Sequence, residues 1–508
     1  MPNNQFGDFQ TPISLARSCL DLLKIPSDAL ILEPTCGRGA FLEAASELAP
    51  DSECYGIEIN ATYAMEASQW GTVTQGNVFE ISLSEVLPNE KKAPIYIIGN
   101  PPWVTSAELK RMSSDNIPPK ENFKKVQGID ALLGGSNFDV CEFIILKALR
   151  EFNARKLHLA MLCKTQVARN VIRFAYEAGL PIVKSSLFRI DAKEWFNANV
   201  DACWFVVEMN PEKTPSYETE IYDSLTRRAD EPAEKFGIVK GKIVSDVAKY
   251  NKVKDADGKS PYEWRSGLKH DAAGVFELTL ANDSYSNKRG EPVDVEREYV
   301  YPYLKSTDIY RGRHRASDKA VIVPQKEFGQ DTLHLKQSAP KLWNYLDTHA
   351  SDLDSRKSSI YKNRPRFSVF GLGSYTFAPY KIAISGLHKV PFFRLITPKD
   401  GKPVVLDDTC YLLAFDDSTE AIMVASVLNS AECLALIDSL IFTDAKRPIT
   451  KKLLDRIDLN KLPLSTQNVI ETAKQIAIEY SLDFDEESAR SMIGNFGFCK
   501  KNEQLFLV

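Results

Sequence analysis

The stretch Leu30–Phe41, LILEPTCGRGAF, decides the fold of the amino-terminal part of the chain. Its three successive aliphatic residues predict a buried strand, and the apolar spacing from Phe41 to Leu48 is typical of a helix. The turn between them contains Gly37 and Gly39. Because glycine lets the main chain approach a ligand closely, this strand–turn–helix unit predicts a binding site at the carboxyl end of a parallel sheet.

The residues on both sides of this unit repeat the alternation of strand and helix. A helix is expected from Thr11 to Leu23, with Thr11 as its N-cap and Pro12 in its first turn. Strand–helix alternation at this spacing indicates an α/β fold with a parallel sheet covered on both faces. Further strands are expected at Cys54–Ile59, Ile95–Ile98, Leu157–Cys163 and Trp204–Glu208.

Two polar residues follow later strands and fit the same ligand site. Glu58 ends the second expected strand, where a carboxylate can accept hydrogen bonds from both hydroxyls of a ribose. Asn77 falls where a third strand would end, and its amide offers a donor and an acceptor to an adenine edge. Together with the glycine turn, these residues predict a cofactor that contains adenosine.

The segment Asn100-Pro101-Pro102-Trp103 predicts the chemistry. Each proline biases the preceding residue toward extended backbone, so the side-chain carbonyl of Asn100 and the main-chain carbonyl of Pro101 are held side by side as acceptors. The exocyclic amine of a base is a poor nucleophile because its lone pair is delocalised into the ring. Two acceptors that hold its hydrogens favour the pyramidal form and stabilise the positive charge that develops on methylation. Trp103 adds a flat face on which a base can stack.

In this order, the glycine turn, Glu58, Asn77 and Asn100–Trp103 resemble the motifs of class I S-adenosylmethionine-dependent DNA amino-methyltransferases. A cofactor motif followed by Asn-Pro-Pro-aromatic and then by a recognition domain is similar to the gamma group of N6-adenine enzymes, which belong mostly to restriction–modification systems. The resemblance implies a Rossmann-like methyltransferase domain with a mainly parallel sheet, followed by a mixed α/β target-recognition domain. It also implies S-adenosyl-L-methionine as cofactor and methyl transfer to N6 of adenine at specific sites in double-stranded DNA.

The resemblance assigns roles residue by residue. Asn100, Pro101, Pro102 and Trp103 would be catalytic. The family often has Ala in place of Thr35, Tyr or Phe in place of Trp103, and usually Asp in place of Asn77, although an Asn can still hydrogen-bond the cofactor adenine. The cofactor site would be lined by Thr11, Glu33, Cys36, Gly37, Glu58, Ile59, Asn77 and Pro102.

A base inside a duplex cannot reach such a site, so the target adenine would have to be flipped out. Relatives place an aromatic residue that stacks on the flipped base just ahead of a strand, at the position of Trp195-Phe196. On this similarity we expect Phe196, together with Trp103, to stack on the target base. The alternative is that Trp195 and Phe196 form a core aromatic pair.

The second half of the chain is expected to bind DNA. The expected boundaries give a catalytic domain at 1–210, a connector at 211–260 and a target-recognition domain at 261–508. Residues 301–366 contain 13 Lys or Arg and 7 Asp or Glu, a net charge of +6 in a chain whose total is −5. A DNA-facing groove needs this polarity, because phosphate contacts dominate affinity. The expected DNA contacts are Arg311, Arg313, Arg356, Lys357, Lys362 and Arg364.

The composition limits the class of protein. With 44% hydrophobic and 26% charged residues, the chain has the composition of a soluble globular protein. No apolar run approaches the roughly 18 residues of a membrane helix, so we expect a cytoplasmic protein with no membrane partner. The nine cysteines are scattered and include no Cys-x-x-Cys pair, which argues against a disulfide framework and against a metal site.

Two alternatives stay open. N4-cytosine methylation uses the same pair of acceptors as N6-adenine methylation. A non-catalytic DNA-recognition subunit on a methylase scaffold is the other alternative, against which the intact Asn100–Trp103 motif counts. Outside the methylase fold there is no convincing cluster of catalytic carboxylates and lysine, so a partner endonuclease or other defence-system subunit would be a separate chain.

Overall fold

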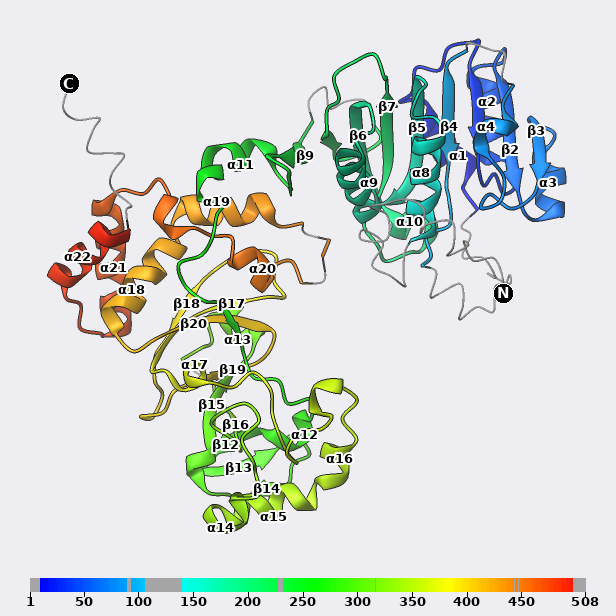
Figure 1. The fold of residues 1–508 in the computed structure, drawn as a ribbon. Coiled ribbons are helices and arrows are strands. Elements are labelled where there is room, and N and C mark those ends of the chain that lie inside the picture. The colour runs from blue at the N-terminus through cyan, green and yellow to red at the C-terminus, as the bar shows by residue number, and fades with distance from the viewer. Residues whose placement is uncertain are drawn as a thin grey trace, which may run out of the picture. The chain divides into compact units, whose positions relative to one another are not determined.

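The chain folds into two compact units, one ending at Ala248 and the other beginning at Lys249 (Figure 1). The structure is a computed structural model. It describes residues 10–496, apart from 89–92, 106–138, 227–231, 316, 443 and 446.

The first unit is built on one ten-stranded sheet with the order β10-β9-β8-β6-β7-β5-β4-β1-β2-β3. The strands from β3 through β2, β1 and β4 to β5 all run parallel, and β7 lies antiparallel between β5 and β6. The expected Rossmann-like α/β fold is therefore confirmed. The strands are β1 (Leu30–Glu33), β2 (Glu53–Glu58), β3 (Thr72–Gln75), β4 (Ile95–Gly99), β5 (Leu157–Lys164), β6 (Ile182–Ile190), β7 (Ala202–Met209), β8 (Glu218–Tyr222), β9 (Glu234–Val239) and β10 (Lys242–Val244).

Amphipathic helices cover this sheet. In α9, the residues Val167, Val171 and Ala175 follow one another at every fourth position and are buried, as helix packing against a sheet requires. The aromatic core includes Trp204 of β7, fully buried and stacked on Phe41 of α2 with ring centroids 5.4 Å apart. The helices are α1 (Ile13–Leu20), α2 (Ala40–Leu48), α3 (Ala61–Ala67), α4 (Leu83–Val86), α8 (Val140–Glu151), α9 (Thr165–Ala178) and α10 (Ala192–Phe196), and the chain enters the second unit within α11 (Val247–Val253).

The first helix begins one residue later than expected. Its N-cap residue is Pro12, and α1 runs from Ile13. Thr11 therefore does not cap the helix, and its hydroxyl is used elsewhere, as described below.

The order of strands creates a switch point beside β1. The chain crosses from β1 to β2 and β3 on one side, and returns to β4 and β5 on the other. In open α/β sheets, ligands bind outside the carboxyl ends of the strands at this point. The end of β4 is Gly99, whose φ is +146°, and a Cβ built there would lie 3.1 Å from Glu33 Cγ. Glycine at this position lets β4 lie close to the side chain that ends β1.

The expected connector at 211–260 is corrected by the structure. Strands β8, β9 and β10 extend the sheet of the first unit, so this unit ends near Ala248 and not near 210. The polar composition suggested a connector because these strands are short and lie toward one edge of the sheet. Only a few of their side chains, such as Thr219, Ile221 and Phe236, are buried, and most of the others are half-buried or exposed.

The second unit is a mixed α/β structure with two sheets, ordered β11-β20-β17-β18 and β14-β13-β12-β16-β15-β19. Its strands are β11 (Arg265–Ser266), β12 (Glu277–Ala281), β13 (Ser284–Asn287), β14 (Pro292–Val293), β15 (Val300–Leu304), β16 (Lys319–Ile322), β17 (Tyr380–Ser385), β18 (Arg394–Ile396), β19 (Val405–Leu406) and β20 (Cys410–Phe415). Its helices are α12 (Ala273–Phe276), α13 (Ser306–Tyr310), α14 (Leu335–Ser338), α15 (Pro340–Thr348), α16 (Ala350–Asp354), α17 (Ser374–Phe377), α18 (Ser418–Leu428), α19 (Ala431–Leu440), α20 (Lys451–Leu454), α21 (Thr466–Tyr480) and α22 (Glu486–Phe496). No single helix in the described part of the chain is long and apolar enough to cross a membrane; only α18 and α19 taken together, bent by 59°, meet that test of length and composition.

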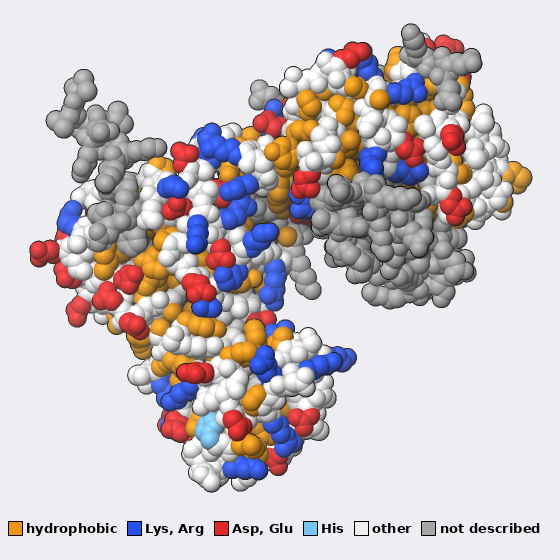
Figure 2. Space-filling model, in the orientation of Figure 1, with side chains coloured by type: hydrophobic (Ala, Val, Ile, Leu, Met, Phe, Trp, Pro, Cys, Tyr) orange, Lys and Arg blue, Asp and Glu red, His pale blue; other side chains and the backbone are white. Residues whose placement is uncertain are grey.

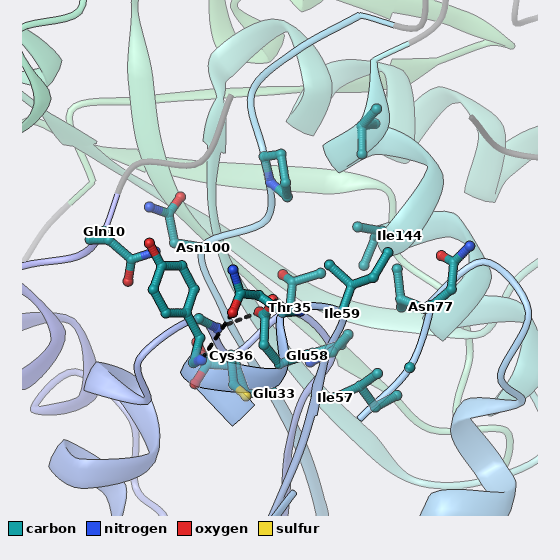
Figure 3. A pocket seen from close by; sticks show the side chains of 18 of the residues that line it. Gln10, Glu33, Thr35, Cys36, Ile57, Glu58, Ile59, Asn77, Asn100 and Ile144 are labelled. Atoms are coloured by element: carbon teal, nitrogen blue, oxygen red, sulfur yellow. Dashed lines mark hydrogen bonds between the residues drawn. The ribbon is translucent and has the colours of Figure 1, made fainter. Parts of the chain in front are cut away.

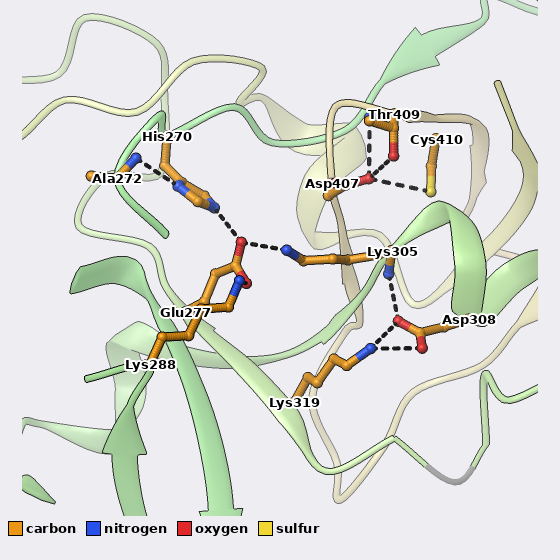
Figure 4. A network of polar contacts seen from close by, with 10 residues as sticks. All are labelled: His270, Ala272, Glu277, Lys288, Lys305, Asp308, Lys319, Asp407, Thr409 and Cys410. Atoms are coloured by element: carbon orange, nitrogen blue, oxygen red, sulfur yellow. Dashed lines mark hydrogen bonds and ion pairs between the residues drawn. The ribbon is translucent and has the colours of Figure 1, made fainter. Parts of the chain in front are cut away.

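A buried carboxylate joins several elements of the six-stranded sheet (Figure 4). Glu277 of β12 accepts from Lys305 and from Lys288, each at 2.6 Å, and His270 Nε2 lies 3.3 Å from it. Burial alone would raise the pKa of Glu277, but these three partners lower it to about 2. A depressed carboxyl pKa stabilises the fold above the unfolded value of 4.5, and this contribution is lost as the pH falls from 4.5 toward 2.

Candidate functional site

An open pocket lies at the carboxyl ends of β1, β2 and β4 (Figure 3). Figure 3 shows Gln10 and Asn100 on one side of it, Asn77 and Ile144 on the other, and Glu58 between them. All eight residues expected to line the cofactor site do line this pocket, and Asn100 lies there with them. The eight are Thr11, Glu33, Cys36, Gly37, Glu58, Ile59, Asn77 and Pro102.

The glycine turn after β1 holds Glu58 in place. Gly37 has a φ of +50°, and its main-chain N–H donates to Glu58 Oε2 at 2.9 Å. The N–H of Asn60 donates to the other oxygen, Oε1, at 2.8 Å. These two bonds fix the Glu58 carboxylate in the wall of the pocket.

Glu33 lies deeper, at the end of β1, and is only 3% exposed. Burial raises the pKa of its carboxyl well above the ordinary value, and the negative charge of Glu58 raises it further. Among the described residues, neither Glu33 Oε2 nor Thr35 Oγ1 has a hydrogen-bond partner, although both atoms are buried. Two buried polar atoms without partners in one turn are unusual in a folded protein, and here they lie beside a pocket.

Asn77 follows β3 and shapes the turn that it begins. Its Oδ1 accepts from the N–H of Phe79 at 3.1 Å, and its Nδ2 donates to Glu80 Oε1 at 3.1 Å. The amide is therefore held at the pocket wall with one Nδ2 hydrogen still available. Phe79, which also lines the pocket, adds an aromatic ring beside it.

Asn100 is oriented by Thr11. Its Nδ2 donates to Thr11 Oγ1 at 3.1 Å, across 89 residues of sequence. This bond uses the nitrogen side of the amide and so fixes which direction the oxygen side faces. The Thr11 hydroxyl, expected to cap a helix, thus ties the start of α1 to the end of β4.

The structure brings Trp103 and Phe196 together. Their rings pack edge to face, with centroids 5.2 Å apart, and they are 5% and 9% exposed. Trp103 Nε1 donates to the carbonyl of Leu162 in β5 at 3.1 Å. The neighbours Pro102 and Val104 line the pocket, while Trp103 points toward β5 and Phe196.

The Cys36 thiol of the pocket is not in the state of a nucleophile. Cys36 is 4% exposed, and burial, with the nearby carboxyls of Glu33 and Glu58, raises the pKa of its thiol. A thiol needs a lowered pKa to act as a nucleophile at neutral pH. Across the described ranges, no group of three or more His, Cys, Asp and Glu side chains is placed to hold a metal ion.

The residues expected to contact DNA have different surroundings in the second unit. Arg311, Arg313, Lys357, Lys362 and Arg364 are exposed. In the view of Figure 2, Lys and Arg side chains are spread over the middle of this unit and Asp and Glu gather toward its α22 end.

The expectation for Arg356 is corrected. Its guanidinium donates to the main-chain carbonyls of Leu353, His270 and Ser368 at 2.7–3.1 Å and lies 3.8 Å from the centre of the Tyr361 ring. Burial also lowers its pKa. Arg356 therefore holds loops of the second unit together, and its donors are not directed at a phosphate.

The sequence analysis missed several residues of the pocket. Val140 and Ile144 come from α8, far along the chain, and nothing in their sequence distinguishes them from core residues. Gln10 and Tyr63 are also in the lining. Phe79 could have been found, since an aromatic two residues after Asn77 sits at the end of the third strand.

Comparisons with known proteins agree with this geometry. No protein-family profile matches the chain. The type II methyltransferase M.NspV of a Nostoc species is 37% identical over 470 residues, which cover 90% of this chain and 97% of that one. The chain belongs to the type II methyltransferases. The predicted class, a DNA methyltransferase of the restriction–modification type, is thereby confirmed, and so is the predicted cofactor, S-adenosyl-L-methionine.

The fold of this type II methyltransferase also occurs in a solved structure. The type IIL restriction–modification enzyme MmeI, determined in complex with DNA, matches 97% of this chain with 72% of its own length. The TM-score is 0.52 and the sequences are 12% identical, so this comparison supports the fold alone.

The burial of the Glu33 carboxyl is expected to lower the free energy of unfolding at neutral pH by a measurable amount. In Glu33→Gln, a neutral side chain of the same shape replaces a carboxyl whose folded pKa is raised. Above pH 4.5 the carboxyl ionises less readily in the folded state than in the unfolded state, so we expect the variant to be more stable at pH 7. The free energy of unfolding at pH 7 should rise by about 1.4 kcal/mol for each pH unit between the unfolded pKa and the folded pKa. Only the part of this shift that lies below pH 7 counts. Urea unfolding of both proteins from pH 4 to pH 8 measures this. The gap should close as the pH falls to 4.5, and a gap that does not depend on pH would show that Glu33 is ionised when folded.

Proposed function

We propose that this methyltransferase transfers a methyl group from S-adenosylmethionine to N6 of a flipped-out adenine at specific sites in duplex DNA. The observation that carries the proposal is the Asn100–Thr11 hydrogen bond, because it orients the amide of an Asn-Pro-Pro-aromatic motif inside the pocket that holds Glu58. We place the enzyme in the gamma group of class I amino-methyltransferases. It would act in the cytoplasm as the modification enzyme of a restriction–modification system, with any endonuclease on a separate chain.

The residues of the pocket fit the cofactor. Two buried polar atoms, Glu33 Oε2 and Thr35 Oγ1, have no partner within the described residues. A cofactor that carries an ammonium and a sulfonium group suits a pocket with two carboxyls at its base. Glu58 would accept from the ribose hydroxyls, and Asn77 would donate its remaining Nδ2 hydrogen to the adenine. When bound, S-adenosylmethionine supplies an activated methyl group.

The catalytic contribution of the protein is to hold the target amine. Asn100 Oδ1 and the main-chain carbonyl of Pro101 would accept the two hydrogens of N6, directing its lone pair toward the methyl group. The same acceptors stabilise the positive charge that develops on the nitrogen. Alignment and these two acceptors are enough, since the leaving group needs no acid, and the extra proton of the product amine can pass to solvent.

The aromatic pair and the basic residues would hold the DNA. A flipped base has lost its stacking partners and needs an aromatic surface. Because Trp103 is 5% exposed and packs against β5 and Phe196, we propose that Phe196 is the ring that stacks on the target adenine and that Trp103 supports Phe196. In the second unit, Arg311, Arg313, Lys357, Lys362 and Arg364 are proposed to contact phosphates; Arg356 is not included.

The identity of the methylated base tests the proposal. The enzyme is incubated with labelled cofactor and mixed-sequence duplex DNA, and the nucleosides are then separated. We expect the label in N6-methyladenine, and we expect Asn100→Ala to lower turnover by about 10²–10³-fold because it removes one preorganised acceptor. Cofactor binding by Asn100→Ala, measured by calorimetry, should be nearly unchanged. Label in N4-methylcytosine would contradict the adenine assignment, and near-normal turnover by the variant would contradict the mechanism.

A matched pair of variants tests the role of Thr11. Thr11→Val keeps the shape but removes the acceptor for Asn100 Nδ2, so the amide loses the hydrogen bond that orients it. We expect kcat at saturating cofactor to fall by up to about tenfold, the worth of one hydrogen bond, while Thr11→Ser stays near the wild type. If Thr11 only lined the cofactor site, the KM for S-adenosylmethionine would rise in Thr11→Val and kcat would not change.

A further inference from the structure

Three large hydrophobic side chains are exposed within six residues of the second unit. They are Leu387, Val390 and Phe392, with exposed fractions of 40%, 62% and 42%, and all lie in the segment that joins β17 to β18. Single exposed hydrophobic residues are common on soluble proteins, but a group of them marks a contact surface. The sequence analysis did not single out this segment.

The segment is held in a defined shape. At its start, Ser385 Oγ lies 2.6 Å from His388 Nδ1 and accepts from the N–H of Leu387 at 3.2 Å. At its end, the side chain of Asn429 accepts from the N–H of Phe393 and donates to its carbonyl, at 3.0 and 2.9 Å. The exposed side chains are therefore presented by an anchored loop.

A second segment lies beside this loop. The ring of Tyr310, at the end of α13, stacks on His388 with centroids 3.9 Å apart. Arg394 lies 4.0 Å from the centre of the Phe392 ring, and its Nε donates to the carbonyl of Ile309 at 3.4 Å. Residues 310–313 and 387–394 thus form one surface, which we call the aromatic–arginine patch.

The patch is positively charged. Arg311, Arg313 and Lys389 are exposed, and within the described part of the chain they form no ion pair. The nearest acid in sequence, Asp308, is already paired with Lys319 at 2.7 Å. Burial and the charge of Arg311 lower the pKa of His388, and burial with Arg394 and Arg315 lowers that of His314 to about 4. Both imidazoles are therefore neutral at pH 7, and the positive field comes from arginine and lysine.

The basic run 356–366 also has three exposed cations without an ion pair among the described residues, Lys357, Lys362 and Arg364, but its two other arginines are already used. Arg356 is used by main-chain carbonyls, and Arg366 pairs with Asp347 at 2.8 Å and with Asp354 at 3.4 Å. A surface that combines unpaired cations with exposed apolar side chains is complementary to a polyanion that also has apolar surface. Duplex DNA is such a partner, with phosphates outside and sugars and base edges in its grooves.

We propose that the aromatic–arginine patch is the surface by which the second unit holds duplex DNA. Arg311, Arg313 and Lys389 contact phosphates, while Leu387 and Val390 lie against sugars and base edges in a groove. The proposal rests on the proposed function, since it names where the substrate of that reaction is bound.

Binding of a fluorescein-labelled, mixed-sequence duplex to the full-length protein tests it, with anisotropy measured over a series of salt concentrations. In the triple variant Arg311→Gln, Arg313→Gln, Lys389→Gln, we expect weaker binding and a flatter slope of log affinity against log salt. The slope should change by about one unit for each phosphate that is no longer neutralised. In Leu387→Ser with Val390→Ser, we expect about tenfold weaker binding with the slope unchanged, because apolar burial is reduced while the cations remain.

Matched controls separate the patch from the rest of the surface. Lys341→Gln removes an exposed cation that is paired with Asp294, and it should change neither affinity nor slope. The proposal would be overturned if the slope of log affinity against log salt became flatter in the double variant Lys362→Gln, Arg364→Gln and stayed unchanged in the triple patch variant. A changed oligomeric state of the patch variants, measured by sedimentation, with DNA affinity unchanged would also overturn it. All changes are at exposed side chains, and equal melting temperatures would confirm that the variants fold.

The experiment can disprove the proposed DNA surface and the proposed reaction separately. If the wild-type protein neither binds nor methylates the duplex, the proposed function is wrong. If it methylates the duplex and the patch variants bind with wild-type affinity and slope, the function stands and the patch is not the DNA surface.

Discussion

Glu33 places a carboxyl at the base of the pocket, in a space left by the missing side chain of Gly99. Burial and the neighbouring charge of Glu58 raise its pKa, so the free protein disfavours the ionised form of this carboxyl. The turn that follows uses its own N–H, at Gly37, to fix Glu58. A pocket built in this way has unmet capacity for positive charge and for hydroxyl donors, and the cofactor of a methyltransferase brings both.

The second constraint is the orientation of one amide. Asn100 follows β4 at the switch point, and Thr11 reaches it from the start of α1. The strand and helix that bring these groups together belong to the same packed sheet unit, so the fold itself sets the orientation of this amide. In the second unit, the ion cluster around Glu277 joins β12 to Lys305 after β15 and Lys288 after β13. A rigid support of this kind suits a unit that must present a surface to a partner.

Much of the first unit could be predicted from the sequence, because its signals are local. The strand at Leu30–Leu32, the glycine turn and Asn100–Trp103 lie within short stretches, and the expected cofactor residues do share one pocket. What failed depended on distant partners. The polar composition at 211–260 suggested a connector because strands near the edge of the sheet bury few side chains. Arg356 looked like a phosphate contact because its partners are main-chain carbonyls, of His270 and Ser368, which leave no mark in the sequence. The patch around Tyr310 and Val390 joins segments almost 80 residues apart and left no pattern to detect.

The most direct measurement is the number of protons exchanged when S-adenosylmethionine binds. Calorimetric titration of the full-length protein at pH 7, in two buffers of different ionisation enthalpy, gives this number. If a cationic group of the cofactor pairs with Glu33, its carboxyl must ionise, and about one proton should be released per cofactor bound. This release should disappear in Glu33→Gln. Binding by the wild-type protein without proton release, or with the same release in the variant, would contradict the role of this buried acid in holding the cofactor.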